Sequence, residues 1–162
     1  MNCLEGKVAI VTGANSGMGM ATVEALSDKG ATVIMLCRNE ERGKEALLRL
    51  TEKKQRKLDL ILCDLGDFES IRNFAAAVKE KYDHIDILVN NAGFISLDRQ
   101  ETKEGLERQF GINHIGHFLL TMERSIIFLS SGLEPKLKAP KASVLPLHYE
   151  RFCRAGFEPA TS

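Results

Sequence analysis

The sequence has no tryptophan, only four prolines and four cysteines, and no apolar run that approaches the roughly 18 residues of a membrane-spanning helix. Residues 1–7 also lack the apolar core of a signal peptide. No two cysteines have the Cys-x-x-Cys spacing, and Cys37 and Cys63 follow apolar runs, so we expect buried thiols rather than metal ligands or half-cystines. These absences predict a soluble protein of the reducing cytoplasm, without a membrane partner.

The sequence also lacks an excess of charge of either sign, because Lys and Arg together number 22 and Asp and Glu also number 22. This balance gives no support for a nucleic-acid partner. The composition is that of an ordinary globular protein, with 44% hydrophobic and 27% charged residues. A chain of 162 residues is long enough to bury a core and forms one domain by default.

The most informative stretch is residues 7–20, where a short apolar run changes directly into a helical pattern. Residues 8–11 are expected to form a buried strand. Three glycines separate this strand from the helix, namely Gly13, Gly17 and Gly19. Glycines here permit a sharp turn, a close approach of the backbone to an anion and tight packing of helix on strand. Asn15 and Ser16 are candidate caps, beside which the free N–H groups of the helix would face a pyrophosphate. An ordinary glycine-rich turn is the alternative.

Strands and helices alternate along the next hundred residues. Further strands are expected at residues 31–36, 58–63 and 85–89, and a fifth at 126–129. Helices are expected at residues 40–53, from Asp67 to about Tyr82, and from about Thr102 through Leu119. This alternation predicts an α/β fold, a Rossmann-like doubly wound parallel sheet truncated after the fourth or fifth strand.

Four motifs in this order resemble those of the short-chain dehydrogenases and reductases. They are the glycine loop (residues 12–19, Thr-Gly-Ala-Asn-Ser-Gly-Met-Gly), Asp64-Leu65, the Asn-Asn-Ala-Gly segment (residues 90–93) and residues 113–118, Asn-His-Ile-Gly-His-Phe. The resemblance covers about residues 5 to 121 and is nearest to the retinol-dehydrogenase-like branch. It implies a nicotinamide cofactor, a small alcohol or carbonyl substrate and the family's homo-oligomers. It also implies cofactor contacts at Gly13, Asn15, Ser16, Gly17, Met18, Gly19, Asp64, Leu65, Asn90, Ala92 and Gly93.

The end of the second strand bears on the choice between NADP and NAD. In such folds an acidic residue there binds the ribose 2′-hydroxyl of NAD. This sequence reads Leu36-Cys37-Arg38-Asn39, without an acid, and Arg38 could pair with a 2′-phosphate. The sequence therefore favours NADP over NAD. The alternative is that Arg38 is only the solvated start of a loop.

The resemblance is incomplete at the catalytic residues. The family uses a tyrosine as acid and base, a lysine four residues later, a serine that polarises the carbonyl and an asparagine that holds a relay water. The resemblance assigns the last two roles to Ser131 and Asn113, which are only 18 residues apart, closer than in the family. The two tyrosines of the sequence, Tyr82 and Tyr149, have no lysine four residues later.

These features predict two parts, a dinucleotide-binding domain at residues 1–121 and an atypical tail at residues 122–162. The closing residues 156–162 resemble a peptide translated from non-coding sequence. By family, the protein is expected to be an NADP-dependent oxidoreductase that transfers hydride, in a form without the Tyr-x-x-x-Lys pair. The alternative is a non-catalytic nucleotide-binding remnant, or a frame-shifted product without function.

Two other polar groups are weaker candidates for sites. His114 and His117 are three residues apart on a predicted helix, a spacing that metal ligands use, but no third ligand is suggested nearby. We therefore expect packing or surface histidines and no metal site. The basic stretch at residues 53–57 is expected to be a solvated turn at the end of a helix rather than a phosphate site.

Overall fold

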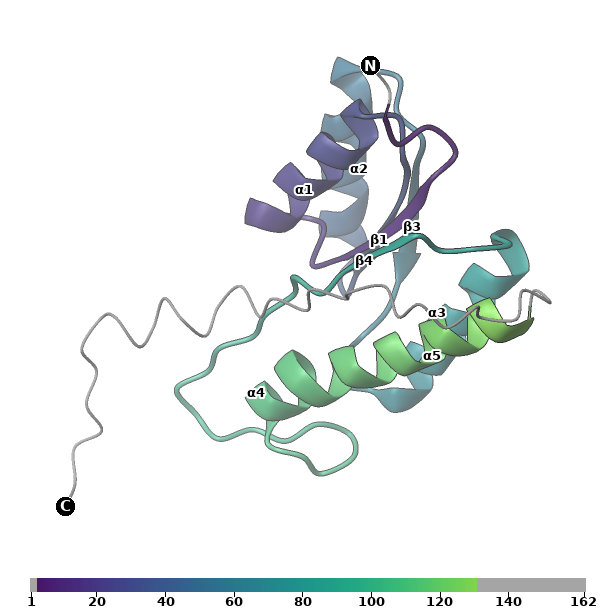
Figure 1. Cartoon of the computed structure of the whole chain (residues 1–162). Helices are drawn as coiled ribbons and strands as arrows, with labels where there is room; N and C mark the ends of the chain where they lie inside the picture. The colour runs from purple at the N-terminus through teal and green to yellow at the C-terminus, as the bar shows by residue number, and fades with distance from the viewer. Residues whose placement is uncertain (1–2, 131–162) are drawn as a thin grey trace, which may run out of the picture.

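The computed structural model describes residues 3–130, and within these residues four parallel strands form one sheet (Figure 1). The strands lie in the order β3–β2–β1–β4, so the chain reverses direction across the sheet after its third strand. This is the order of a doubly wound Rossmann-like fold, and the predicted fold class is confirmed. The strands are β1 (Val8–Thr12), β2 (Thr32–Cys37), β3 (Leu58–Leu62) and β4 (Ile87–Val89).

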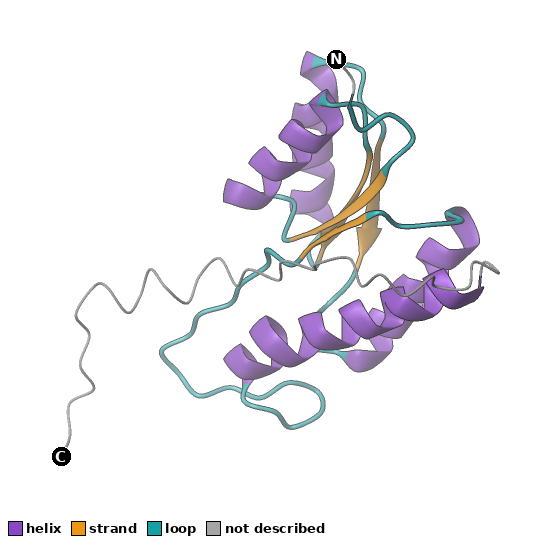
Figure 2. Ribbon diagram, viewed as in Figure 1, coloured by secondary structure: helices purple, strands orange, loops and turns teal. Residues whose placement is uncertain are grey.

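Helices cover both faces of the sheet (Figure 2). The helices α1 and α2 lie on one face, and α3 packs with α5 on the other. A π-helical segment, η1, joins the short α4 to α5 without a break in the rod. The helices are α1 (Gly17–Asp28), α2 (Glu40–Lys53), α3 (Phe68–Lys81), α4 (Arg108–Phe110), η1 (Gly111–Gly116) and α5 (His117–Ser130).

The alternation of side chains along β1 divides the interior into two cores. Val8 and Ile10 point to the core under α3 and α5, while Ala9 and Val11 point to the core under α1 and α2. All five residues of β1 are buried, which explains why the strand reads as a continuous apolar run rather than an alternating one. This central strand carries the glycine loop at its end.

Capping side chains set the starts of two helices where the sequence predicts them. The side chain of Asn39 accepts a hydrogen bond from the Arg42 amide at 2.9 Å and begins α2. The carboxylate of Asp67 accepts from the amides of Glu69 and Ser70 at 2.9 and 3.2 Å and begins α3. Both residues satisfy amides that have no partner within their own helix.

The predicted strand at residues 126–129 is wrong, because these residues belong to α5. The segment from His117 to Ser130 contains no glycine or proline that would stop the helix. A short apolar run cannot be assigned to strand or helix from its pattern alone. The described sheet therefore ends at β4, and α5 continues past the expected domain boundary at residue 121. The division into two parts stays a prediction, because residues 131–162 lie outside the described residues.

The last predicted helix also begins later than expected. Residues 101 and 107 form an isolated antiparallel bridge, so the chain turns back on itself before the helix starts. The Glu107 carboxylate then accepts hydrogen bonds from the Gln109 and Phe110 amides, both at 2.8 Å, which fixes the start of α4 at Arg108. None of the helices within residues 3–130 has the length and hydropathy needed to cross a bilayer.

Candidate functional site

The carboxyl ends of the four strands lie level at one edge of the sheet. Thr12 pairs with Leu36, and Val11 pairs with Val89, so β1, β2 and β4 end together. The loops that follow parallel strands meet at this edge, which is where open α/β sheets bind their ligands. The glycine loop, Arg38, Asp64 and the Asn-Asn-Ala-Gly segment all lie there, as predicted.

The glycine loop packs against its neighbours through backbone atoms. A Cβ atom on Gly13 would lie 2.9 Å from the Ala92 Cα, and one on Gly19 would lie 2.2 Å from the Gly13 carbonyl oxygen. Gly17 has a φ of +52°, a conformation that favours glycine. Side chains at these positions would fill or distort the loop. The arrangement therefore forms a backbone cradle of the kind that a pyrophosphate requires.

The start of α1 leaves its positive end open to this cradle. Ser16 occupies the N-cap position and is exposed, but its side chain makes no capping bond within the described chain. The first turn of α1 contains no acidic residue, and Met18 beside it is 54% exposed. Asn15 is half-buried in the same turn. Amides without an intrahelical partner and an unneutralised helix dipole suit an anion.

Thr12 joins the glycine loop to the Asn-Asn-Ala-Gly segment. Its fully buried hydroxyl accepts hydrogen bonds from the amides of Asn91 and Ala92, both at 2.8 Å. The Asn91 side chain donates to the Thr12 carbonyl at 2.9 Å, and Asn90 donates to the Thr121 hydroxyl at 3.2 Å. The two motifs, almost 80 residues apart in sequence, are thus held as one unit, with Gly93 exposed at its rim.

Asn113 lies in the π-helical segment and faces the same unit. Its side chain accepts from the Phe94 amide and donates to the Phe94 carbonyl, both at 2.8 Å. Phe94 directly follows the Asn-Asn-Ala-Gly segment, so the predicted asparagine is positioned against the predicted motif. π-Helical turns within helices occur frequently at functional sites.

His117 is a site residue that the sequence analysis missed. Its ring is buried, with Nε2 3.0 Å from the Thr12 hydroxyl and Nδ1 3.1 Å from the Asn113 carbonyl oxygen. Burial lowers the pKa of His117, so the ring is neutral at pH 7. Its i, i+4 spacing from Asn113 is visible in the sequence. Its contact with Thr12, 105 residues away, is not.

The neighbouring histidine has a different environment. His114 is exposed and stacks on Phe110, with ring centroids 5.3 Å apart. Within residues 3–130, no group of three His, Cys, Asp or Glu side chains could hold a metal ion. The two histidines thus differ, because His114 lies on the surface and His117 is packed in the interior.

Arg38 is exposed at the end of β2 and forms no ion pair with a described residue. The preceding thiol of Cys37 is buried, and burial raises its pKa to about 11, so it carries no charge at pH 7. The nearest acid in sequence, Glu40, pairs with Lys44 at 2.6 Å. This corner of the sheet therefore presents a guanidinium group that no residue between 3 and 130 pairs with.

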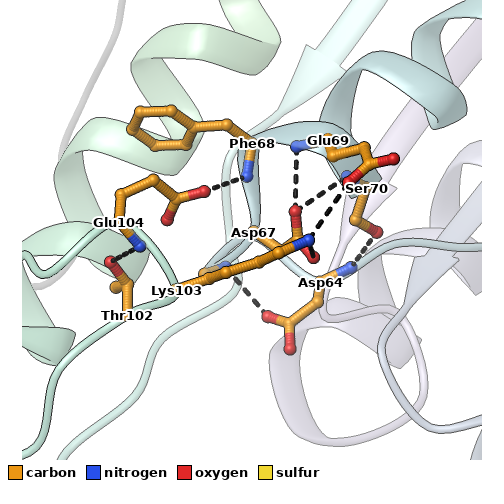
Figure 3. Close-up of polar contacts among 9 residues, drawn as sticks. Asp64, Asp67, Phe68, Glu69, Ser70, Thr102, Lys103 and Glu104 are labelled. Atoms are coloured by element: carbon orange, nitrogen blue, oxygen red, sulfur yellow. Dashed lines mark hydrogen bonds and ion pairs between the residues drawn. The ribbon is translucent and has the colours of Figure 1, made fainter.

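Asp64 and Leu65 follow β3, and a distant turn fixes their surroundings (Figure 3). The Asp64 carboxylate accepts from the Gly66 amide at 2.8 Å. Leu65 is buried. A Cβ atom on Gly116 would lie only 2.2 Å from the Leu65 carbonyl oxygen. Lys103 binds both Asp67 and Glu69, at 3.0 and 3.1 Å. The loop before α4 is thereby anchored to the start of α3.

Two pockets of about 290 and 220 Å³ are lined by residues outside the glycine loop. The larger lies between β3 and α3, beside Ile61 and Phe74, and reaches Leu62 at the carboxyl end of β3, while the smaller lies beside Arg56. Arg56 is buried and pairs with Glu24 and Asp28 at 3.0 and 2.9 Å. The Arg56 side chain therefore links the basic stretch at residues 53–57 to α1, whereas the predicted solvated turn would leave it in water. Ser131, the candidate catalytic serine, lies outside the described residues.

A doubly wound sheet with a glycine loop at its carboxyl edge defines a protein with a Rossmann-type fold, which is typical of dinucleotide-binding proteins. The family model of the short chain dehydrogenases matches residues 7–132. The chain belongs to this family.

Known proteins similar to this chain include retinol dehydrogenases. Human retinol dehydrogenase 13 is 41% identical over 119 residues, which cover 73% of this chain and 36% of that protein. The WW domain-containing oxidoreductase of Gallus gallus is 43% identical over 118 residues, which cover 72% of this chain and 28% of that protein. The chain thus spans about a third of the length of these relatives.

Solved structures share the same fold. The Pseudomonas aeruginosa RhlG/NADP active-site complex superposes with a TM-score of 0.67 and 28% identity, over 80% of this chain and 51% of that one. A Serratia marcescens short-chain dehydrogenase/reductase variant gives a TM-score of 0.65 and 28% identity, over 76% of this chain and 51% of that one.

Proposed function

We propose that the chain binds NADP(H) at the carboxyl edge of its sheet, as the cofactor-binding part of an oxidoreductase that acts on an alcohol or carbonyl. The observation that carries the proposal is the backbone cradle of the glycine loop, closed onto the Asn-Asn-Ala-Gly segment by Thr12. The bound cofactor supplies the hydride. Family membership supports both the cofactor class and the reaction class.

The residues present suit the parts of such a cofactor. The backbone of Gly13, Gly17 and Gly19 and the start of α1 would hold the pyrophosphate, beside Asn15, Ser16 and Met18. Asp64 and Leu65 would border the adenine. Asn90, Ala92 and Gly93 would border the nicotinamide half. Asn113 would stand beside that half, tied to Phe94.

The preference for NADP over NAD rests on Arg38. Its guanidinium group is exposed and has no described ion-pair partner, and no acid follows β2 to bind a ribose hydroxyl. A guanidinium group can bind a 2′-phosphate through two parallel hydrogen bonds. The structurally similar Pseudomonas aeruginosa RhlG is known in an active-site complex with NADP.

Calorimetric titration of NADPH and NADH tests this preference. Arg38→Ala is expected to lower the NADPH affinity by about tenfold or more, the value of a charge-assisted contact, and to leave the NADH affinity unchanged. Arg42→Ala, an exposed arginine one helical turn further on, is the matched control. Equal affinities for the two cofactors in all three proteins would reject the preference.

A second candidate is a nucleotide-binding protein without catalysis. Tyr82 is followed four residues later by Asp86 rather than lysine, and its hydroxyl donates to Asp59 at 3.0 Å. Burial, with the Asp59 charge, raises the pKa of Tyr82 to about 12. Tyr149 has no lysine four residues later. Oxidation of NADPH with a panel of aldehydes and ketones separates the candidates, because loss of the proton-transfer group removes about 10²–10⁴-fold in rate.

A cytoplasmic location and the homo-oligomer usual in the family belong to the same proposal. Free, buried thiols at Cys37 and Cys63 are consistent with a reducing compartment.

A further inference from the structure

The Thr12 hydroxyl donates a single hydrogen bond, and its two other contacts leave one direction for that proton. Its oxygen has two lone pairs, and the Asn91 and Ala92 amides occupy both at 2.8 Å. Its single proton must therefore point to another acceptor. The His117 Nε2 lies at 3.0 Å, closer than the Val89 carbonyl oxygen at 3.4 Å.

This count fixes the state of the imidazole ring. Nε2 faces an oxygen whose lone pairs are already taken, so Nε2 must accept rather than donate. The proton of a neutral ring then resides on Nδ1, which donates to the Asn113 carbonyl at 3.1 Å. A doubly protonated ring would point an N–H group at the Thr12 oxygen, which has no free lone pair, and the hydrogen bond to Thr12 would be lost.

The amide and the ring of His117 contact different backbone carbonyls. The amide bonds to the His114 carbonyl, and Nδ1 of the ring contacts the Asn113 carbonyl. The side chain thus adds a second link between the start of α5 and the turn that carries Asn113.

The contacts form a closed circuit. Thr12 holds the Asn-Asn-Ala-Gly segment, Phe94 at its end holds the Asn113 side chain, and the Asn113 carbonyl holds His117, which returns to Thr12. Every link is between 2.8 and 3.1 Å. A displacement of the helix is therefore transmitted to the cofactor loop.

We propose that His117, as the Nδ1–H tautomer, is a positioning residue that couples the cofactor loop to the helical turn carrying Asn113. The inference rests on the proposed function, because that function makes these two elements parts of one site. The ring is buried, and its two nitrogens contact Thr12 and Asn113. It acts through Thr12 and Asn113, and it sets the distance between them.

Amide variants of His117 separate its two links. The amide of His117→Gln lies near the position of Nε2 and can keep the bond to Thr12, whereas that of His117→Asn lies near Nδ1 and can keep the bond to Asn113. His117→Leu keeps neither. NADPH affinity is expected to fall about fivefold to tenfold for each bond lost, the net value of one hydrogen bond, so the leucine variant loses most. The exposed His114 gives the control, His114→Leu.

Nitrogen NMR of the imidazole rings reports the tautomer, which a purely packing role would not specify. The expected spectrum has a protonated Nδ1 and an unprotonated Nε2 for His117 at pH 7. The opposite tautomer would overturn the proposal, as would folded Gln and Asn variants with wild-type NADPH affinity, even if His117→Leu fails to fold.

A parent chain that binds neither NADPH nor NADH would reject the proposed function but not this inference. Hydrogen exchange at the Asn91 and Ala92 amides then decides. Faster exchange in the folded His117 variants than in His114→Leu supports the coupling, and equal exchange overturns it.

Discussion

Thr12 and His117 lie 105 residues apart in the sequence, yet their side chains share a buried hydrogen bond of 3.0 Å. One residue begins the glycine loop and the other begins α5. The bond joins β1 to α5 beside the candidate cofactor edge. The stability of the loop and the position of Asn113 therefore depend on the same pair.

Removal of the Thr12 hydroxyl is expected to destabilise the fold. Thr12→Val keeps the shape of the side chain but leaves two part-buried amides and the buried His117 ring without their partner. An unsatisfied buried group costs about 1–3 kcal/mol, so the free energy of unfolding in urea should fall by about that amount. Thr12→Ser restores the hydroxyl and is the control. Equal stability of the two variants would show that the Thr12 hydroxyl does not stabilise the fold.

Gly19 is expected to tolerate no side chain. A Cβ there would lie 2.2 Å from the Gly13 carbonyl oxygen, a backbone atom that cannot rotate away. Gly19→Ala should lower the free energy of unfolding by about 1–3 kcal/mol, the range for overpacking, and displace the glycine loop. Gly93→Ala is the control for stability, because its Cβ would meet no atom within 4 Å. A Gly19→Ala protein with the melting temperature of the control would refute the close packing.

The structure predicts a loss of stability below neutral pH that depends on His117. Burial holds the pKa of the folded residue below its ordinary value of 6.5, so both states are neutral above that pH and the stabilisation is complete. As the pH falls below 6.5, the unfolded chain gains a proton that the folded chain excludes, and the free energy of unfolding decreases until the lower, folded pKa is passed.

Urea unfolding between about pH 7.5 and 5.5 measures this dependence. His117→Gln should flatten the profile, while His114→Gln should retain it. Asp67 and Asp86 do not interfere, because their pKa values lie below the ordinary 3.8 and both remain ionised over this range. If the free energy of unfolding of the unsubstituted protein does not change over this pH range, the predicted lowering of the His117 pKa is contradicted.

The sequence predicts the fold well where a segment carries its own signal. The β1 strand, the helix starts at Glu40 and after Asp67 and the glycine loop depend on neighbouring residues, and each lies where predicted within one or two residues. Residues 126–129 carry an apolar pattern common to strands and helices. They form a helix, because no glycine or proline separates them from the helical residues before them.

The site was predictable in its motifs but not in their connections. Gly13 and Asn90 stand out by residue type and spacing. The role of His117 requires that Thr12 and Asn113 meet, and such meetings arise from the crossovers of the fold. Arg38 is intermediate, since its position after β2 is predictable but its lack of an ion-pair partner among the described residues is not.

Self-association is expected from one face of the last helical rod. Phe110, Phe118 and Met122 are 52%, 59% and 49% exposed, and their spacing places them on one side of it. Among the described strands, none pairs with the outer side of β4. Phe118→Glu should shift size-exclusion elution toward the monomer, while Leu48→Glu, on the exposed side of α2, should not. A parent chain that elutes as a monomer at all concentrations would contradict this expectation.

The most direct test of the account is a map of NADPH contacts by amide NMR on the ¹⁵N-labelled chain. The account predicts shifts at Gly13, Gly19 and Ala92, at the carboxyl edge of the sheet, and smaller shifts at Asn113 through Phe94. Saturating NADPH that leaves these amides unchanged, or shifts confined to the cavity beside Ile61 and Phe74, would contradict it.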